Sequence, residues 1–148
     1  MYTFDANLFS DLHKDVYGFR PRGHWFYDAN TTDQERQEEW DYLCKRLDEQ
    51  IDEENAAKAK ALAELHARVA VLRTKGAQDD HQALKWIVQS LKPSHMDLCY
   101  GGDWVCYELG LGFDCAYMFN KVCRELEEEF TALDDDANRH YYAMSFEE

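Results

Sequence analysis

The feature that most constrains this fold is a long run without proline or glycine that ends only at Gly76. Within it, Thr32 and Glu35 have the spacing of a capping box, so we expect a helix to begin there. A helix over residues 32–75 would be roughly 60 Å long at 1.5 Å per residue. A compact domain of this size has a diameter of only roughly 30 Å. We therefore predict an all-α fold in which one very long, protruding helix, about residues 32–75, packs with four or five shorter helices.

The middle of this helix has nothing to bury. Residues 52–60 carry no large apolar side chain, although their composition has high helix propensity. This stretch can either continue as a solvated rod or break near Asn55 into a helical hairpin. We favour the rod, because Asn55 is the strongest turn-forming residue present.

Two apolar seams flank the rod, with the three- and four-residue spacing of a helix face. Their members are Trp40, Leu47, Ile51, Leu62, Leu65, Val69 and Leu72. Acidic side chains predominate before residue 55 and basic ones after residue 57, which would let two copies lie antiparallel. A protruding apolar seam must be covered, so we expect a homodimer through this helix. A well-capped, solvated helix that needs no partner is the alternative.

The remaining segments are expected to complete one helical domain, residues 1–148. Residues 1–30 form a short helix that ends near Gly18 and a loop rich in arginine and aromatic residues. Residues 79–133 form the helical core. Residues 134–148 form an acidic tail, whose Tyr141, Tyr142 and Phe146 we expect to fold back onto that core.

A net charge of −14 excludes whole classes of partner. Direct binding to nucleic acid or to an anionic membrane needs clustered Lys and Arg. There is also no apolar run long enough to span a membrane, and no signal peptide, so we predict a cytoplasmic protein. The acids concentrated near the C-terminus are instead expected to bind a host protein with a basic surface. The residues proposed for that contact are Glu127, Glu128, Asp134, Asp135 and Asp136.

The sequence contains no recognisable catalytic, cofactor or metal motif. Its five cysteines form an odd set without CxxC spacing, which favours small buried hydrophobes over zinc ligands. Cys106 and Cys115 lack an adjacent base, although a triad could still form in space. His95 and Cys99 stand one helical turn apart, and we interpret this as coincidence. We predict that the protein is not an enzyme.

The loop near Pro21 is a small basic island bordered by aromatic residues. Such an island could hold a phosphate or a nucleotide base. The candidate ligand-binding residues are Lys14, Arg20, Arg22, His24 and Trp25. In the alternative interpretation, the arginines pair with nearby carboxylates and the aromatic residues belong to the core.

The stretch that begins at Phe9, FSDLHKDVYGFRPR, resembles the N-terminal signature of a family of small, uncharacterised tailed-bacteriophage proteins. The long charged helix that follows is similar too. The resemblance implies a phage gene product that acts in the cytoplasm of the infected bacterium. It implies no functional residues.

These observations lead to three hypotheses. The first is a non-enzymatic phage accessory protein that acts by protein–protein interaction, in its most specific form a DNA-mimic inhibitor of a host defence or nucleic-acid enzyme. The second is a protein that binds a small ligand or nucleotide signal through the Arg20 and Arg22 loop. The third is a structural or assembly protein of the virion.

Overall fold

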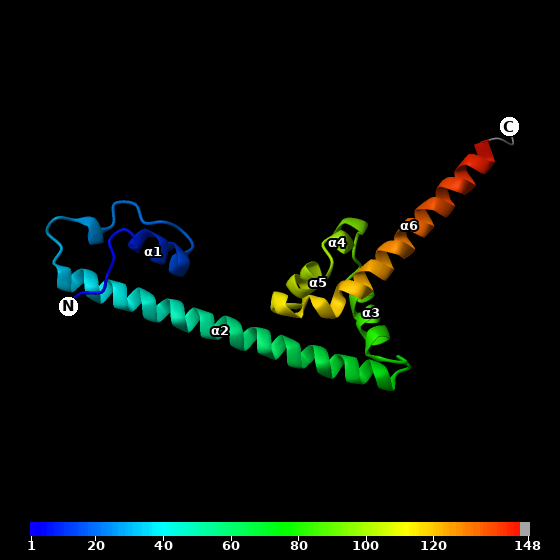
Figure 1. The fold of residues 1–148 in the computed structure, drawn as a ribbon, viewed down its shortest axis with the longest axis horizontal. Coiled ribbons are helices and arrows are strands. Elements are labelled where there is room, and N and C mark those ends of the chain that lie inside the picture. The colour runs from blue at the N-terminus through cyan, green and yellow to red at the C-terminus, as the bar shows by residue number, and fades with distance from the viewer. Residues whose placement is uncertain (146–148) are drawn as a thin grey trace. The chain divides into compact units, whose positions relative to one another are not determined.

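The computed structural model describes residues 1–145 and contains no strand over that range (Figure 1). The elements are α1 (Phe9–Tyr17), η1 (Trp25–Tyr27), α2 (Asp33–Thr74), α3 (Asp80–Ser90), α4 (His95–Cys99), α5 (Gly102–Leu109), η2 (Phe113–Cys115) and α6 (Tyr117–Ser145), where η denotes a 3₁₀ helix. The predicted all-α fold with one long helix is confirmed. Among these residues, no helix combines the length and the apolar character needed to cross a membrane.

The long helix begins where the capping box predicts. The Thr32 Oγ1 accepts a hydrogen bond from the Glu35 N–H at 3.2 Å, and the Glu35 carboxylate accepts one from the Thr32 N–H at 2.8 Å. Helix α2 then continues without a break through Asn55 to Thr74. The rod is therefore confirmed, and the hairpin alternative is wrong.

Contacts divide the chain into two compact units, Met1–Ala56 and Ala57–Glu148, which we call the N-terminal and C-terminal units. The sequence predicted one domain over residues 1–148, with α2 as a protrusion from it. Each unit has its own apolar core, to which the α2 residues of that unit contribute. The single domain stays a prediction.

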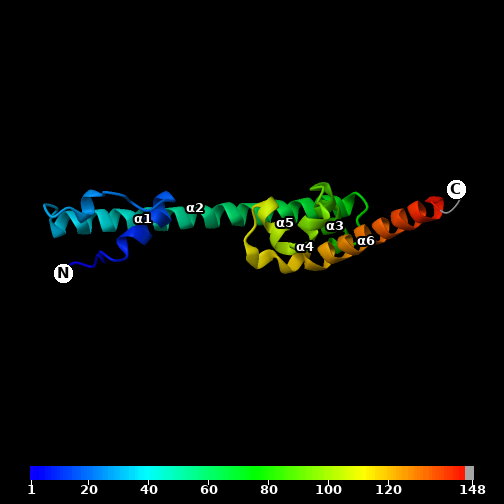
Figure 2. The same cartoon turned by 90° about the horizontal axis from the view of Figure 1, so that it is seen from above.

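The N-terminal unit is organised around α1, which lies alongside α2 a few turns after the start of that helix in both views (Figures 1 and 2). The Phe9 and Phe26 rings stack with centroids 3.8 Å apart, and Leu43 of α2 is fully buried with them. Gly18 ends α1 in the left-handed conformation at φ 84°, as its position predicts. The Arg36 guanidinium ties α2 to the loop by donating a 2.8 Å hydrogen bond to the Phe26 carbonyl.

The C-terminal unit is built around the first half of α6, against which α3, α4 and α5 pack (Figures 1 and 2). Its fully buried side chains include Ile87, Val105, Phe119 and Val122. Asp79 caps α3, since its carboxylate accepts a hydrogen bond from the Gln82 N–H. Within this unit α4 packs directly on α6.

The last helix is longer than the sequence predicted. The helical core was expected to end at residue 133, with an acidic tail over residues 134–148. Helix α6 instead runs from Tyr117 to Ser145. The expected return of the tail onto the core concerns Phe146 and the side chains of Tyr141 and Tyr142, which lie outside what the structure describes.

A homodimer was expected because the apolar seams of α2 were thought to protrude uncovered. In the structure they do not. Trp40 and Leu47 pack partly buried against the core of the N-terminal unit. In the C-terminal unit Leu65 and Val69 are buried, with Leu62 and Leu72 packed beside them; only Ile51 of the seven is exposed, at 46%. The premise of an uncovered seam is wrong, because the chain's own short helices and loops cover it.

Candidate functional site

Helix α4 is a single short turn whose position is fixed at both ends. The Ser94 Oγ accepts a hydrogen bond from the Asp97 N–H at 3.1 Å, and the Asp97 carboxylate accepts one from the Ser94 N–H at 2.8 Å. Leu98, 2% exposed, anchors the helix in the core of the C-terminal unit. Because side chains four apart share a helix face, His95 and Cys99 point the same way.

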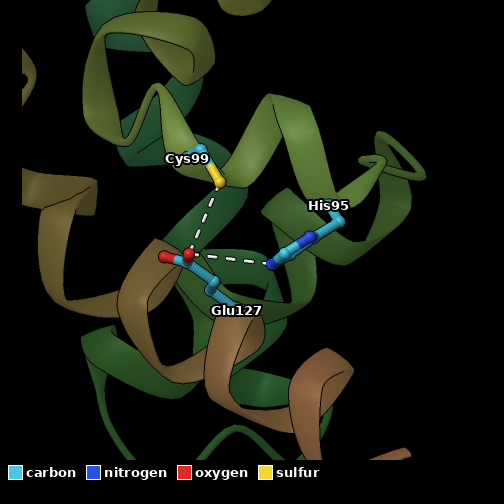
Figure 3. A group of neighbouring side chains, drawn as sticks. All are labelled: His95, Cys99 and Glu127. Atoms are coloured by element: carbon cyan, nitrogen blue, oxygen red, sulfur yellow. Dashed lines mark hydrogen bonds and ion pairs between the residues drawn. The ribbon is translucent and has the colours of Figure 1, made fainter. Parts of the chain in front are cut away.

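That face of α4 lies over Glu127 of α6 (Figure 3). The Cys99 Sγ–H donates a hydrogen bond to the Glu127 Oε1 at 3.4 Å. The His95 Nε2 lies 3.7 Å from the same oxygen. The three side chains thus bring a nitrogen, a sulfur and an oxygen within 4.8 Å of one another. They are open to solvent, with the side chains of His95 and Glu127 exposed by 52% and 38%.

The carboxylate determines the state of the thiol in this group. The hydrogen bond to Glu127 raises the pKa of Cys99 above its usual range, with smaller contributions from burial and from the negative charge of Glu127. The sulfur is therefore a protonated thiol at neutral pH. A protonated thiol is a weak nucleophile, so the geometry does not favour covalent catalysis by Cys99.

Two other acids of α6, Glu125 and Glu129, face α3 instead and are already paired. The Glu125 carboxylate lies 2.8 Å from the His81 Nε2, and this hydrogen bond is the main reason that the pKa of Glu125 is lowered. The Lys85 ammonium donates a 2.5 Å hydrogen bond to Glu129. These pairs hold α3 against α6 and leave the adjacent acids for other contacts.

Beyond the core, residues 128–140 of α6 contain no buried side chain. Every residue from 128 to 140 is exposed. Of the acids proposed to contact a partner, Glu128, Asp134, Asp135 and Asp136 lie in this stretch, and Asp136 has Arg139 as an ion-pair neighbour at 3.8 Å. Glu127 lies at its base, beside His95 and Cys99.

An apolar groove opens where this exposed stretch leaves the core. It has a volume of about 360 Å³ and lies between the end of α3 and α6. Its apolar lining comes from Pro93, Leu126, Phe130 and Leu133, and Leu133 is 68% exposed. Acidic surface and apolar groove are therefore adjacent on one helix.

The basic residues proposed to bind a ligand lie in the N-terminal unit, where at least one of them is paired with a carboxylate. The Arg20 guanidinium lies 2.5 Å from the Asp11 carboxylate and also donates to the Ser10 hydroxyl. Lys14 and Arg22 are exposed. Pairing with a carboxylate is the alternative that the sequence left open, and for Arg20 it is the observed one.

His24 and Trp25 have structural surroundings as well. The His24 Nδ1 caps η1 by accepting a hydrogen bond from the Phe26 N–H at 3.0 Å. Burial lowers the pKa of His24 and keeps it neutral, so it offers no positive charge to a phosphate. The hollow beside Trp25 is lined by Glu35, Glu38 and Glu39, which would repel a phosphate. The loop therefore does not support the nucleotide hypothesis.

The cysteines follow the prediction of small buried hydrophobes with two exceptions. Cys106, Cys115 and Cys123 are buried in the C-terminal unit. Burial raises the pKa of Cys106 to about 11, which leaves it an unreactive thiol. Cys44 is partly buried, and Cys99 is exposed.

Sequence reasoning missed the group at Glu127 because it interpreted the spacing of His95 and Cys99 as coincidence. One signal could have revealed half of it: Ser94 and Asp97 have capping-box spacing directly after Pro93, which predicts a helix there. No sequence pattern indicates that Glu127 faces that helix, because the pairing depends on how α4 packs on α6.

Comparison with known proteins finds no matching family model, curated protein or solved structure. The resemblance to a bacteriophage family stays a prediction.

Proposed function

We propose that this protein is a non-enzymatic phage accessory protein that binds a basic segment of a host protein through residues 126–140 of α6. The observation that carries the proposal is that α6 continues for residues 128–140 with every residue exposed. An isolated helix of this length is marginal in water, so a partner that packs on it would stabilise it.

Charge and shape together describe the partner. The acids of this stretch outnumber its one base, Arg139, and attract a positively charged surface. The groove at Phe130 and Leu133 provides an apolar anchor point of about 360 Å³. The occupant is therefore a basic helix or loop of another protein that also carries one bulky apolar side chain.

The DNA-mimic form of this hypothesis requires a higher density of charge. Residues 128–140 span roughly 20 Å of helix at 1.5 Å per residue. B-DNA carries about a dozen phosphates over that length. The acids in the stretch are Glu128, Glu129, Asp134, Asp135 and Asp136. Because this density is far lower, we propose electrostatic docking to a basic protein segment rather than imitation of a duplex.

The test is affinity capture from a bacterial host lysate, followed by calorimetric titration of the captured protein once it is purified. Asp134→Asn combined with Asp135→Asn should weaken binding, and raised salt should weaken the wild-type complex. A double variant in α2, Asp52→Asn with Glu53→Gln, removes the same charge elsewhere and should bind normally. Equal loss in both variants, or binding that is insensitive to salt, would contradict the proposal.

A second pair of variants tests the apolar anchor. Leu133→Ala shortens an exposed side chain that lines the groove and should weaken binding by about tenfold or more, as for a residue at the centre of an interface. Leu8→Ala truncates a similarly exposed leucine in the N-terminal unit and should leave binding unchanged. If both variants bind as well as the wild type, the groove is not part of the interface.

A further inference from the structure

We propose that the His95 Nε2, the Cys99 Sγ and the Glu127 carboxylate bind one Zn²⁺ ion on the surface of the C-terminal unit. The side chains supply the three kinds of atom, nitrogen, sulfur and oxygen, that zinc takes as ligands in proteins. This site shares Glu127 with the base of the proposed docking surface, but the docking tests use residues further along α6.

The distances fit a tetrahedral ion. With Zn–N and Zn–O near 2.1 Å and Zn–S near 2.3 Å, ligand atoms on a tetrahedron lie about 3.3–3.6 Å apart. The Sγ of Cys99 is already 3.4 Å from the Glu127 Oε1, and the Nε2 of His95 is 3.7 Å from it. All three atoms lie within 4.8 Å of one another. Small side-chain rotations that move the ligand atoms by about 1 Å would therefore complete the coordination.

The scaffold that holds these ligands is firm although the ligands themselves are exposed. The capping box at Ser94 fixes the turn that carries His95 and Cys99, and the buried Leu98 fixes that turn to the core. Glu127 lies on the part of α6 that packs against α4. Two of the three ligands thus stand one helical turn apart on the same helix, and the third comes from a neighbouring helix that packs against it.

The donor set also selects among metals. Ca²⁺ and Mg²⁺ prefer oxygen ligands throughout, whereas a thiolate with an imidazole selects a softer ion such as Zn²⁺. Three protein ligands leave a fourth position for water or for an incoming group. As the Zn–S bond forms, the proton that Cys99 now shares with Glu127 is released to solvent.

The proposal is tested with tag-free, full-length protein and Co²⁺ as an optical probe. Tetrahedral Co²⁺ bound to a thiolate gives a sulfur-to-cobalt charge-transfer band, and added ZnCl₂ should displace it at one equivalent. Cys99→Ser should abolish the band, and His95→Ala and Glu127→Gln should each weaken metal binding by about tenfold or more. Because all three side chains are at the surface, circular dichroism should be unchanged in every variant.

Matched controls separate this site from adventitious binding. Cys44→Ser removes the other accessible thiol, and Glu128→Gln removes the neighbouring carboxylate; both should bind Co²⁺ like the wild type. The proposal is overturned if no thiolate–cobalt band appears, or if the band persists in Cys99→Ser. It is overturned equally if Cys44→Ser loses the band. Failure of this test leaves the partner-binding measurements on Asp134 and Leu133 unaffected, so the two proposals can fail separately.

Discussion

Substitution of Gly102 by alanine would push α5 away from the start of α6. A Cβ at this position would lie 2.0 Å from the Ala116 carbonyl oxygen and 2.8 Å from the Asn120 Oδ1. An ordinary carbon–oxygen contact is about 3.3 Å, so the backbone must move by more than about 1 Å. Overpacking against side chains costs about 1–3 kcal/mol of stability. The clash here is with a backbone carbonyl, which moves less easily than a side chain, so we expect a cost near 3 kcal/mol. Loss of the hydrogen bond from the Gly102 N–H to Asn120, at 2.9 Å, adds about 1 kcal/mol.

Against this stands the better helix propensity of alanine, worth at most about 1 kcal/mol in a helix interior. The expected net result for Gly102→Ala is a loss of about 3 kcal/mol in the free energy of unfolding, measured by urea titration followed by circular dichroism. Asn120→Ala removes the hydrogen bond without the clash and should cost only about 1 kcal/mol. A Gly102→Ala protein as stable as the wild type would show that α5 does not approach α6 as closely as described.

Three further outcomes are expected. Leu43→Ala should lower the free energy of unfolding by about 2–5 kcal/mol because Leu43 is fully buried, whereas Ile51→Ala on the same helix should change it by no more than about 0.5 kcal/mol; urea titration measures both. In the native protein a maleimide should modify the exposed Cys99 long before Cys106, whose pKa of about 11 and burial protect it, as mass spectrometry after timed quenching would show. Burial lowers the pKa of His24 from its ordinary value of 6.5. The neutral imidazole therefore stabilises the fold above pH 6.5, and this stabilisation is lost as the pH falls through the lowered pKa. On acidification the melting temperature should fall less for His24→Asn than for the wild type.

Local signals in the sequence predicted where α1 ends and where α2 begins. The capping box at Thr32 and the stop at Gly18 each involve residues within a few positions of one another, so the responsible contacts can be inferred from spacing alone. The end of α6 could not be inferred in this way. The sequence of α6 carries no helix stop signal before the acidic run. The helix therefore continues through that run as far as the helix propensity of its residues allows.

The candidate site could be predicted only in part, because its third member comes from a distant segment. His95 and Cys99 are neighbours through helix geometry, which a sequence reveals. Glu127 joins them only because Leu98 of α4 is buried against α6. The ion pair of Arg20 also depends on the folded structure. Its guanidinium lies next to the Asp11 carboxylate, which neutralises the positive charge that was proposed to bind a ligand.

An apolar stripe on a helix shows that something must cover it, but not what does. In α2 the stripe at Trp40 and Leu65 is covered by other elements of the same unit, so it carries no evidence for a partner. The second half of α6 presents the reverse case, because Leu133 and the acids around it belong to a regular helix that its own unit leaves exposed. Exposure of a helix that is marginal alone is stronger evidence for a partner than periodicity is. We therefore place the proposed binding surface of this protein on α6 rather than on the long helix.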